Sequence, residues 1–142
     1  MRIADVLRNK GAGVVTINPE ATVRELIAGL VDQNIGAMVV VGADGVVGIV
    51  SERDVVRQLH KHGASVLSGP VSKIMTSTLA TCTKADTVDS LTMLMTNNRV
   101  RHVPVLDGRN LIGIVSIGDV VKTRMEELEN EQRQLQSYII QG

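Results

Sequence analysis

Residues 47–56 read VGIVSERDVV, and residues 112–121 repeat this pattern as IGIVSIGDVV, sixty-five positions later. Residues 22–26 return at the same offset as residues 87–91, with Thr, Val and Leu unchanged. Each apolar run alone would be common, but one offset shared by separated segments indicates an internal repeat. The sequence therefore predicts two similar units with pseudo-twofold symmetry, and function is expected where the units meet.

Each repeat is predicted to have the element order strand, helix, strand, strand, helix, after a short helical turn. In the first repeat the turn, strand, helix, hairpin and last helix are expected at residues 3–7, 14–17, 22–33, 38–50 and 51–62. In the second repeat the turn, strand, helix, hairpin turn and last helix start are expected at residues 71–75, 79–82, 86–97, 107–110 and 116. Thr22 and Glu25 fit a capping box, which fixes the start of the first long helix.

Neither repeat has enough layers to bury its sheet alone, so the two sheets are expected to pack against each other. The expected fold class is α/β (α+β), with repeats at residues 1–67 and 68–124 forming one pseudo-twofold module. Residues 125–142 are expected to extend the last helix beyond the repeat. We expect an apolar seam at four-three spacing on this helix, formed by Val121, Met125, Leu128, Leu135 and Ile139 and interrupted by Gln132.

Composition limits the class of protein and its partners. The 142 residues are 44% hydrophobic, with no Trp, no Phe and one Tyr, and fifteen basic residues balance fifteen acidic ones. The chain therefore lacks the basic surface and aromatic platforms that nucleic-acid binding uses. Without a leader or a run long enough to span a membrane, we expect a cytoplasmic protein with no membrane partner. The single cysteine, Cys82, is expected to be a buried strand thiol, with a reactive role as the alternative.

The sharpest local pattern is Gly-x-x-Ser-x-x-Asp, which occurs once in each repeat. Its serine and aspartate are Ser51 and Asp54 in the first repeat, and Ser116 and Asp119 in the second. A serine at a helix start and an aspartate in the first turn suit a sugar diol and a phosphate. The same residues also satisfy ordinary helix capping. Two copies at one offset favour a binding site over capping alone.

On these residues, together with RHVPV at residues 101–105 and the Pro19/Thr22 approach to the first long helix, the chain resembles the CBS domain pair, or Bateman module. The resemblance covers roughly residues 1–124. It implies tandem CBS repeats that bind adenosine-containing ligands: AMP, ADP, ATP, NAD or S-adenosylmethionine. It also implies that the protein is not an enzyme and carries no catalytic cofactor.

The resemblance implies roles for particular residues. Asp54 and Asp119 match the aspartate that binds the ribose hydroxyls, with Ser51 and Ser116 nearby. Phosphate groups are expected at Arg53, Arg101 and His102. The walls of the base site are expected to be Thr16, Ile17, Met38, Thr81 and Val103.

The resemblance also implies that the two sites differ. It pairs the basic strand at Arg101 and His102 with Asp54, where Arg53 adds further charge. Asp119 instead faces Gly36 and Ala37, which supply no charge. We therefore expect stronger nucleotide binding beside Asp54 than beside Asp119.

Three functions follow as hypotheses. The leading one is a homodimeric regulatory module that binds an adenine nucleotide between its repeats and signals to an unknown regulated protein. The alternative is an interaction protein with vestigial crevices that acts through its C-terminal helix, and the third is an enzyme acting on nucleotides. His60-Lys61-His62 is interpreted as a solvated helix end, since two histidines at this spacing point apart and no further ligand is evident, so no metal site is expected.

Overall fold

The computed structural model of the chain describes residues 1–11, 13–77 and 79–141. The helices are α1 (Ile3–Lys10), α2 (Val23–Asp32), α3 (Glu52–His62), α4 (Val88–Asn98) and α5 (Ile117–Gln141). The strands are β1 (Thr16–Ile17), β2 (Ala37–Gly42), β3 (Gly45–Ser51), β4 (His102–Asp107) and β5 (Asn110–Ser116). Two short 3-10 helices, η1 (Gly63–Ser68) and η2 (Val71–Lys73), join the repeats. The mixed helix and strand fold predicted from the sequence is confirmed.

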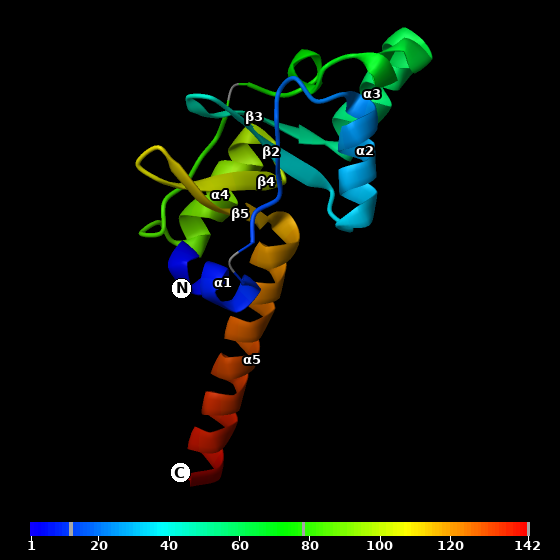
Figure 1. Ribbon diagram of the computed structural model, residues 1–142. Coiled ribbons are helices and arrows are strands. Elements are labelled where there is room, and N and C mark those ends of the chain that lie inside the picture. The colour runs from blue at the N-terminus through cyan, green and yellow to red at the C-terminus, as the bar shows by residue number, and fades with distance from the viewer. Residues whose placement is uncertain (12, 78, 142) are drawn as a thin grey trace.

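The two hairpins carry the repeat symmetry down to single residues. In β2–β3, Ala37 pairs with Ser51, and in β4–β5, His102 pairs with Ser116. Both hairpins also carry a register irregularity at the equivalent position. The two hairpins meet in the middle of the molecule (Figure 1), where β3 contacts β5. The predicted meeting of the two repeats through their sheets is therefore observed.

The first strand of each repeat is shorter than predicted. β1 pairs in parallel with β2 over Thr16 and Ile17, which leaves residues 14–15 outside the sheet. The strand expected at residues 79–82 is reduced to one parallel bridge between Cys82 and Val105. Leu79, within this segment, lines a cavity between the repeats and does not continue a ladder. Burial raises the pKa of the Cys82 thiol to about 12, with the nearby Asp86 charge adding to the shift, as expected for a structural thiol.

Each leading turn packs into the core of the other repeat. Ile3 and Val6 of α1 are buried with the residues of α4 and β4. Val71 and Ile74, around η2, are buried with the residues of α2 and β2. This exchange ties the two repeats together and places α1 beside α5 and below β5 (Figure 1).

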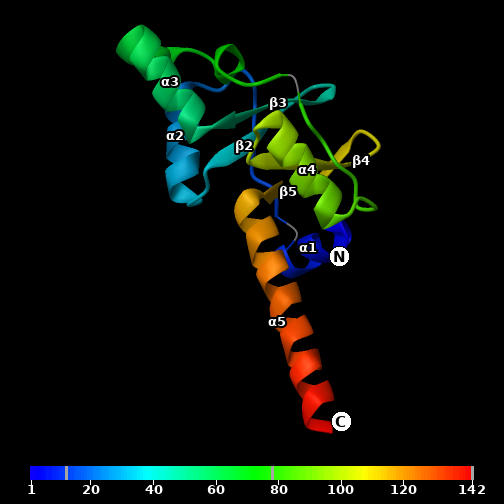
Figure 2. The same cartoon turned by 180° about the vertical axis from the view of Figure 1, so that it is seen from behind.

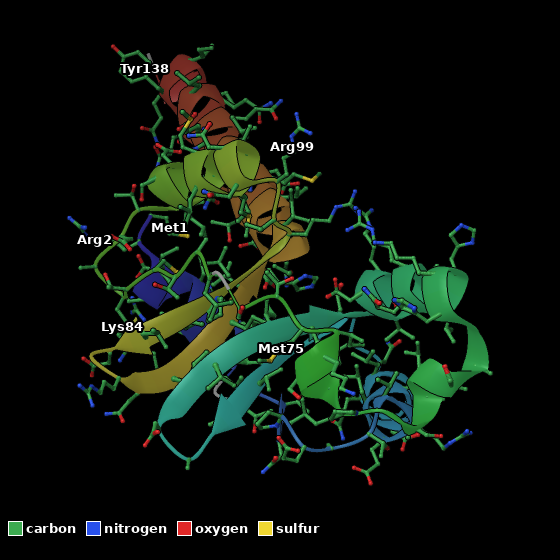
Figure 3. All side chains as sticks on the ribbon, turned by 90° about the horizontal axis from the view of Figure 1, so that it is seen from above. Met1, Arg2, Met75, Lys84, Arg99 and Tyr138 are labelled. Atoms are coloured by element: carbon green, nitrogen blue, oxygen red, sulfur yellow. The ribbon has the colours of Figure 1, made fainter. Side chains whose placement is uncertain are left out.

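Two glycines make the exchange possible. A Cβ at Gly113 would lie 2.6 Å from Leu7 Cδ2, and one at Gly48 would lie 2.7 Å from Met75 Sδ. Both distances are shorter than a Cβ tolerates, so a side chain at Gly113 would force Leu7 to shift, and one at Gly48 would press on Met75 and on the Thr76 carbonyl oxygen, 2.9 Å away. Met75 lies against the first hairpin near the centre of the molecule (Figure 3). The repeated glycine of the Gly-x-x-Ser-x-x-Asp pattern therefore has a packing role.

The helices cover the sheets on opposite sides of the pair. α2 and α3 lie at one end of the molecule, and α4 lies over the hairpins when the molecule is seen from behind (Figure 2). The helix α5 continues far beyond the rest of the chain, and its apolar residues Leu128, Leu135 and Ile139 are exposed (Figure 1). Within the described parts of the chain, no helix is both long and apolar enough to cross a membrane.

Candidate ligand-binding crevice

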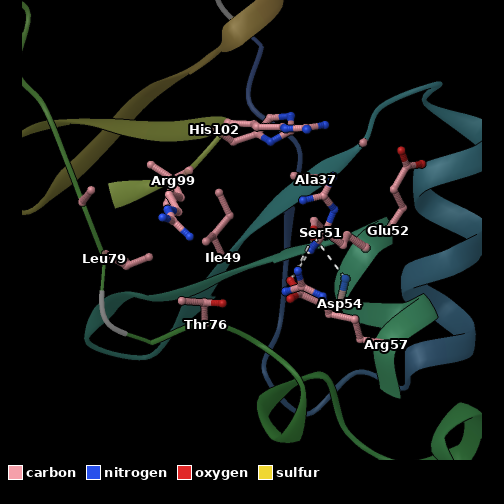
Figure 4. A pocket seen from close by; sticks show the side chains of 15 residues that line it. Ala37, Ile49, Ser51, Glu52, Asp54, Arg57, Thr76, Leu79, Arg99 and His102 are labelled. Atoms are coloured by element: carbon pink, nitrogen blue, oxygen red, sulfur yellow. Dashed lines mark hydrogen bonds between the residues drawn. The ribbon is translucent and has the colours of Figure 1, made fainter. Parts of the chain in front are cut away.

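A cavity of about 290 Å³ opens between the two repeats beside Asp54. One wall comes from the start of α3 and the neighbouring ends of β2 and β3. The opposite wall comes from residues 79–80 and 99–102 of the second repeat. Figure 4 shows Ser51 and Asp54 on one side, with Arg99 and His102 approaching from the other. The structure thus brings together residues of both repeats, as the pseudo-twofold arrangement predicts.

Ser51 and Asp54 form a reciprocal helix cap. The Ser51 backbone N–H donates to Asp54 Oδ2 at 2.8 Å, and the Asp54 backbone N–H donates to Ser51 Oγ at 3.3 Å. The Ser51 hydroxyl lies 3.1 Å from the same carboxylate oxygen. The capping interpretation is correct, and both residues also line the cavity. A carboxylate held rigidly in this way is well placed to accept hydrogen bonds from a diol.

Four arginines line the same cavity. Arg53 and Arg101 were predicted from the sequence, whereas Arg57 and Arg99 were not. Arg57 lies one turn after Arg53 on α3, and residues four apart share a helix face, so Arg57 could have been predicted from its spacing to Arg53. Arg99 adopts a left-handed conformation with φ of 54° where α4 ends, which the sequence does not indicate.

The cavity lining carries an excess of positive charge. Its acidic side chains are Glu52 and Asp54, against four guanidinium groups. Guanidinium groups stay charged at any physiological pH and bind phosphate with two parallel hydrogen bonds. The arrangement can therefore hold a ligand that combines a diol with more than one negative charge.

His102 also lines the cavity. Burial lowers the pKa of its imidazole, and the Lys10 ammonium lowers it further, against the opposing effect of Asp119 and Glu52. A lowered pKa favours the uncharged imidazole, and the assignment of His102 to the phosphate stays a prediction. A neutral imidazole offers one hydrogen-bond donor and one acceptor.

The five residues expected around the base do not line this cavity. Met38 and Val103 are 2% and 0% exposed and belong to the two cores, so the expectation that they form walls is wrong. Ile17 packs against the core formed by α2, β2 and the residues around η2, while Thr16 and Thr81 are exposed. The apolar lining comes from other positions: Ala37, Ile49, Leu79, Ala80 and Val100. Side chains alternate between the faces of a strand, and the neighbours of Met38, Thr81 and Val103, namely Ala37, Ala80 and His102, line the cavity instead. No residue of β1 is among the lining residues.

The second aspartate has a partner that the sequence did not reveal. Lys10 Nζ lies 2.7 Å from Asp119 Oδ2 and also donates to the Ile114 carbonyl oxygen at 2.7 Å. The expectation that no charge faces Asp119 is therefore wrong. Burial alone would raise the pKa of Asp119, but hydrogen bonds from Lys10 and Ser116 hold it below its ordinary value.

The histidine cluster gives no sign of a metal site. His60 and His62 are exposed at the end of α3. In residues 1–11, 13–77 and 79–141, no group of three histidine, cysteine or acidic side chains is placed to hold a metal ion.

Comparison with known proteins decides the family. The model of the CBS domain matches residues 3–61 and again residues 71–126. The chain is a CBS domain protein. The two matches coincide with the two repeats, and the gap between them falls on η1.

Two relatives match over most of this chain. The CBS domain-containing protein CBSX3, mitochondrial, of Arabidopsis thaliana is 36% identical over 149 residues, which cover 99% of this chain and 72% of the relative. The crystal structure of the CBS-domain containing protein ATU1752 from Agrobacterium tumefaciens is 44% identical, with a TM-score of 0.83 over 87% of this chain and 92% of that one.

A more distant CBS domain pair, that of protein MJ0100, was solved in complex with 5′-methylthioadenosine and S-adenosyl-L-methionine. It is 22% identical, with a TM-score of 0.80 over 89% of this chain and 98% of that one. At this identity the likeness shows the shared fold of the pair.

Proposed function

We propose that this CBS domain protein is a regulatory module that binds a phosphorylated adenosine ligand in the crevice beside Asp54. The observation that carries the proposal is the convergence of a capped carboxylate, a hydroxyl and four arginines on one cavity between the repeats. Asp54 and Ser51 bind the ribose hydroxyls, and the arginines bind the phosphates. AMP, ADP, ATP and NAD have this combination of groups.

The positive charge of the crevice favours phosphorylated adenosine ligands over S-adenosylmethionine. S-adenosylmethionine carries a sulfonium, an ammonium and a single carboxylate, so its net charge is positive, and guanidinium groups at close range repel net positive charge. 5′-Methylthioadenosine has no negative charge for the arginines to bind. The complex of the distant pair with these two compounds supports adenosine recognition by the fold, and the arginines select among adenosine ligands here.

The proposal is tested by calorimetric titration of the full chain with AMP, ADP, ATP, NAD, S-adenosylmethionine and 5′-methylthioadenosine. At least one phosphorylated ligand is expected to bind at least tenfold more tightly than either of the last two. A thermal melt gives an independent readout, since ligand at a hundred times its dissociation constant adds about 2.7 kcal/mol to the free energy of unfolding. The proposal is contradicted if none of AMP, ADP, ATP and NAD binds, or if S-adenosylmethionine binds more tightly than all four.

The second part of the proposal is that occupancy is transmitted to a partner and that no reaction is catalysed. A ligand touching both repeats favours the arrangement of repeats that it fits best, and a partner that prefers one arrangement responds to it. Incubation with ATP or NAD, followed by product analysis, tests the absence of catalysis. Formation of any product that depends on the crevice arginines contradicts it.

A ligand-independent interaction protein is the second candidate, because α5 exposes a line of large apolar side chains. We propose that this seam holds a homodimer together. The two functions are separable, since the seam lies on the projecting part of α5 and the crevice lies between the hairpins. Chains that dimerise but bind no adenosine ligand favour the second candidate.

We propose the cytoplasm as the site of action. The relative in Arabidopsis thaliana is named as mitochondrial, so a mitochondrial location is the competing possibility. Subcellular fractionation of cells that make the protein decides it.

A further inference from the structure

The two repeated aspartates have different surroundings. Among the described residues, Asp54 accepts side-chain and backbone hydrogen bonds only from Ser51. Asp119 accepts the equivalent bond from the Ser116 backbone, at 2.8 Å, and a second bond from the Lys10 ammonium, at 2.7 Å. The first aspartate is therefore open to a ligand, whereas the second already has a cationic partner.

The difference continues at the neighbouring strands. The Ile114 carbonyl oxygen accepts the other hydrogen bond of Lys10, at 2.7 Å. Its counterpart, the Ile49 carbonyl oxygen, accepts from the Thr76 backbone N–H at 2.8 Å and forms a β-bridge there. The chain at Thr76 thus runs along the edge of the first crevice and leaves Asp54 free. At the equivalent position beside Asp119, here called the second crevice, the Lys10 side chain bonds to both the Ile114 carbonyl oxygen and the Asp119 carboxylate.

The exchange of leading segments explains why only Asp119 is paired with a cation from a leading segment. α1 is fixed on the second repeat by buried Ile3 and Val6, by Leu7 over Gly113, and by a 2.9 Å hydrogen bond from Ile3 N to Asp86 O. It continues as a helix of eight residues, so its last residue, Lys10, reaches Asp119.

The counterpart of α1 in the first crevice is η2. This 3-10 helix has three residues and ends at Lys73, before the chain turns into the bridge at Thr76. No equivalent ammonium therefore reaches Asp54 from the described part of this segment.

The pair between Lys10 and Asp119 is shielded enough to compete with a ligand. The side chains are 32% and 22% exposed. An ammonium donates up to three hydrogen bonds, and the two it makes here occupy a carboxylate oxygen and a carbonyl oxygen. A ribose diol at Asp119 needs the same carboxylate, so it must displace Lys10 and leave the ammonium without its partner.

We infer that Lys10 is a built-in occupant of the second crevice and sets the number of ligands that the module holds. The inference rests on the proposed function, since it concerns the same class of adenosine ligand. The native chain takes one ligand, beside Asp54. The site beside Asp119 takes a second only when the Lys10 ammonium is removed.

Calorimetric titration of the full chain with AMP tests the inference. The native protein is expected to bind one AMP per chain, and Lys10→Met, which keeps the aliphatic stem, is expected to bind two. The double variant Lys10→Met/Asp119→Ala is expected to return to one. Arg8→Met is the matched control, because Arg8 lies on the same helix with a 73% exposed side chain and pairs with Asp5.

The outcomes separate this inference from the proposed function. One AMP per chain in both the native protein and Lys10→Met overturns the inference and leaves the proposed function intact. Weaker AMP binding in Lys10→Met also overturns it, since Lys10 would then be a ligand for phosphate. No binding in the native protein but one AMP in Lys10→Met supports the inference and contradicts the proposed site beside Asp54. Absence of binding in every variant overturns both.

Folding of the variants is checked by circular dichroism. Lys10→Gln, which also removes the charge, is a second variant with the same expected gain of one site. If Lys10→Met is unfolded and Lys10→Gln is folded with one site, the inference is overturned.

Discussion

Asp54 and Asp119 hold equivalent positions at the starts of α3 and α5, and each is bonded to the serine three residues before it. Substitution of either residue removes the same kind of helix cap, so the cost in helix stability is matched. What differs is the far side of each carboxylate, where Asp54 faces the arginine-lined cavity and Asp119 faces Lys10. This matched pair isolates ligand binding from capping.

Asp54→Ala is expected to weaken AMP binding more than Asp119→Ala does. Loss of a carboxylate that binds a diol costs about 1.5–3 kcal/mol, the range for hydrogen bonds to charged groups, or roughly 10- to 150-fold in affinity. Calorimetric titration of both variants measures the effect. Equal losses, or a larger loss for Asp119→Ala, contradict the asymmetry between the sites.

Arg101→Ala is expected to reduce affinity for AMP about tenfold or more while leaving adenosine binding nearly unchanged, because only AMP has a phosphate for the guanidinium to bind. AMP affinity is also expected to fall as salt rises, because mobile ions screen partly exposed charges. Arg109→Ala, in the hairpin turn away from the cavity lining, is the control. An unchanged ratio of AMP to adenosine affinity in Arg101→Ala places the phosphate elsewhere.

His102 makes stability depend on pH. Its pKa is lowered in the folded protein by burial and by Lys10, so between that value and 6.5 the unfolded chain binds more protons. Stability is therefore expected to fall as pH drops through this window, by about 1.4 kcal/mol for each unit of pKa difference. Urea unfolding at pH 7.5 and 5.5 measures the change, which should be smaller in His102→Gln.

The charges of Asp119 and Glu52 raise the pKa of His102, but burial and Lys10 outweigh them, so the sign holds. His60→Gln, at the exposed end of α3, is the control and should lose as much stability between pH 7.5 and 5.5 as the native protein does. An equal drop in His102→Gln and the native protein assigns the pH dependence to other groups.

At the scale of elements, the caps and hairpins were predictable because their signals are local. Thr22 caps α2 with Glu25 reaching back, as the capping box predicts. The exchange of α1 and η2 was not predictable, because apolar turns such as those at Ile3 and Val71 suit either core. Lys10 was missed as a consequence, since its partner depends on which repeat α1 joins. Met38, Thr81 and Val103 were misassigned for a different reason, since the adjacent residue of each segment faces the cavity.

The exchange makes α1 part of the second core. Ile3→Ala removes a fully buried side chain and is expected to lower the free energy of unfolding by about 2–5 kcal/mol. Urea denaturation measures the loss. Arg8→Ala, on the exposed face of the same helix, is expected to change stability by less than about 0.5 kcal/mol. A small effect of Ile3→Ala shows that α1 is not held in the core in solution.

At the scale of the whole molecule, the repeats form a closed unit with two cores, and α5 extends beyond it. The seam residues on α5 are each more than half exposed: Val121, Met125, Leu128, Leu135 and Ile139. A large apolar line on a projecting helix indicates an interaction surface, because monomers rarely leave such surfaces uncovered. Gln132 interrupts the seam, as a single polar residue does when it fixes the register of paired helices.

The seam is expected to hold a homodimer. Truncation after Arg124 removes most of it and leaves both Ser-x-x-Asp segments intact, so light scattering should show loss of the dimer while AMP binding persists. The truncation also removes the 3.5 Å contact between the N-terminal ammonium and Glu127. Leu135→Glu tests the seam without shortening the helix, with the neighbouring Gln134→Glu as the control for added charge. If Leu135→Glu and the truncated chain both stay dimeric, the interface lies on the repeats, and α5 is left to bind a different partner.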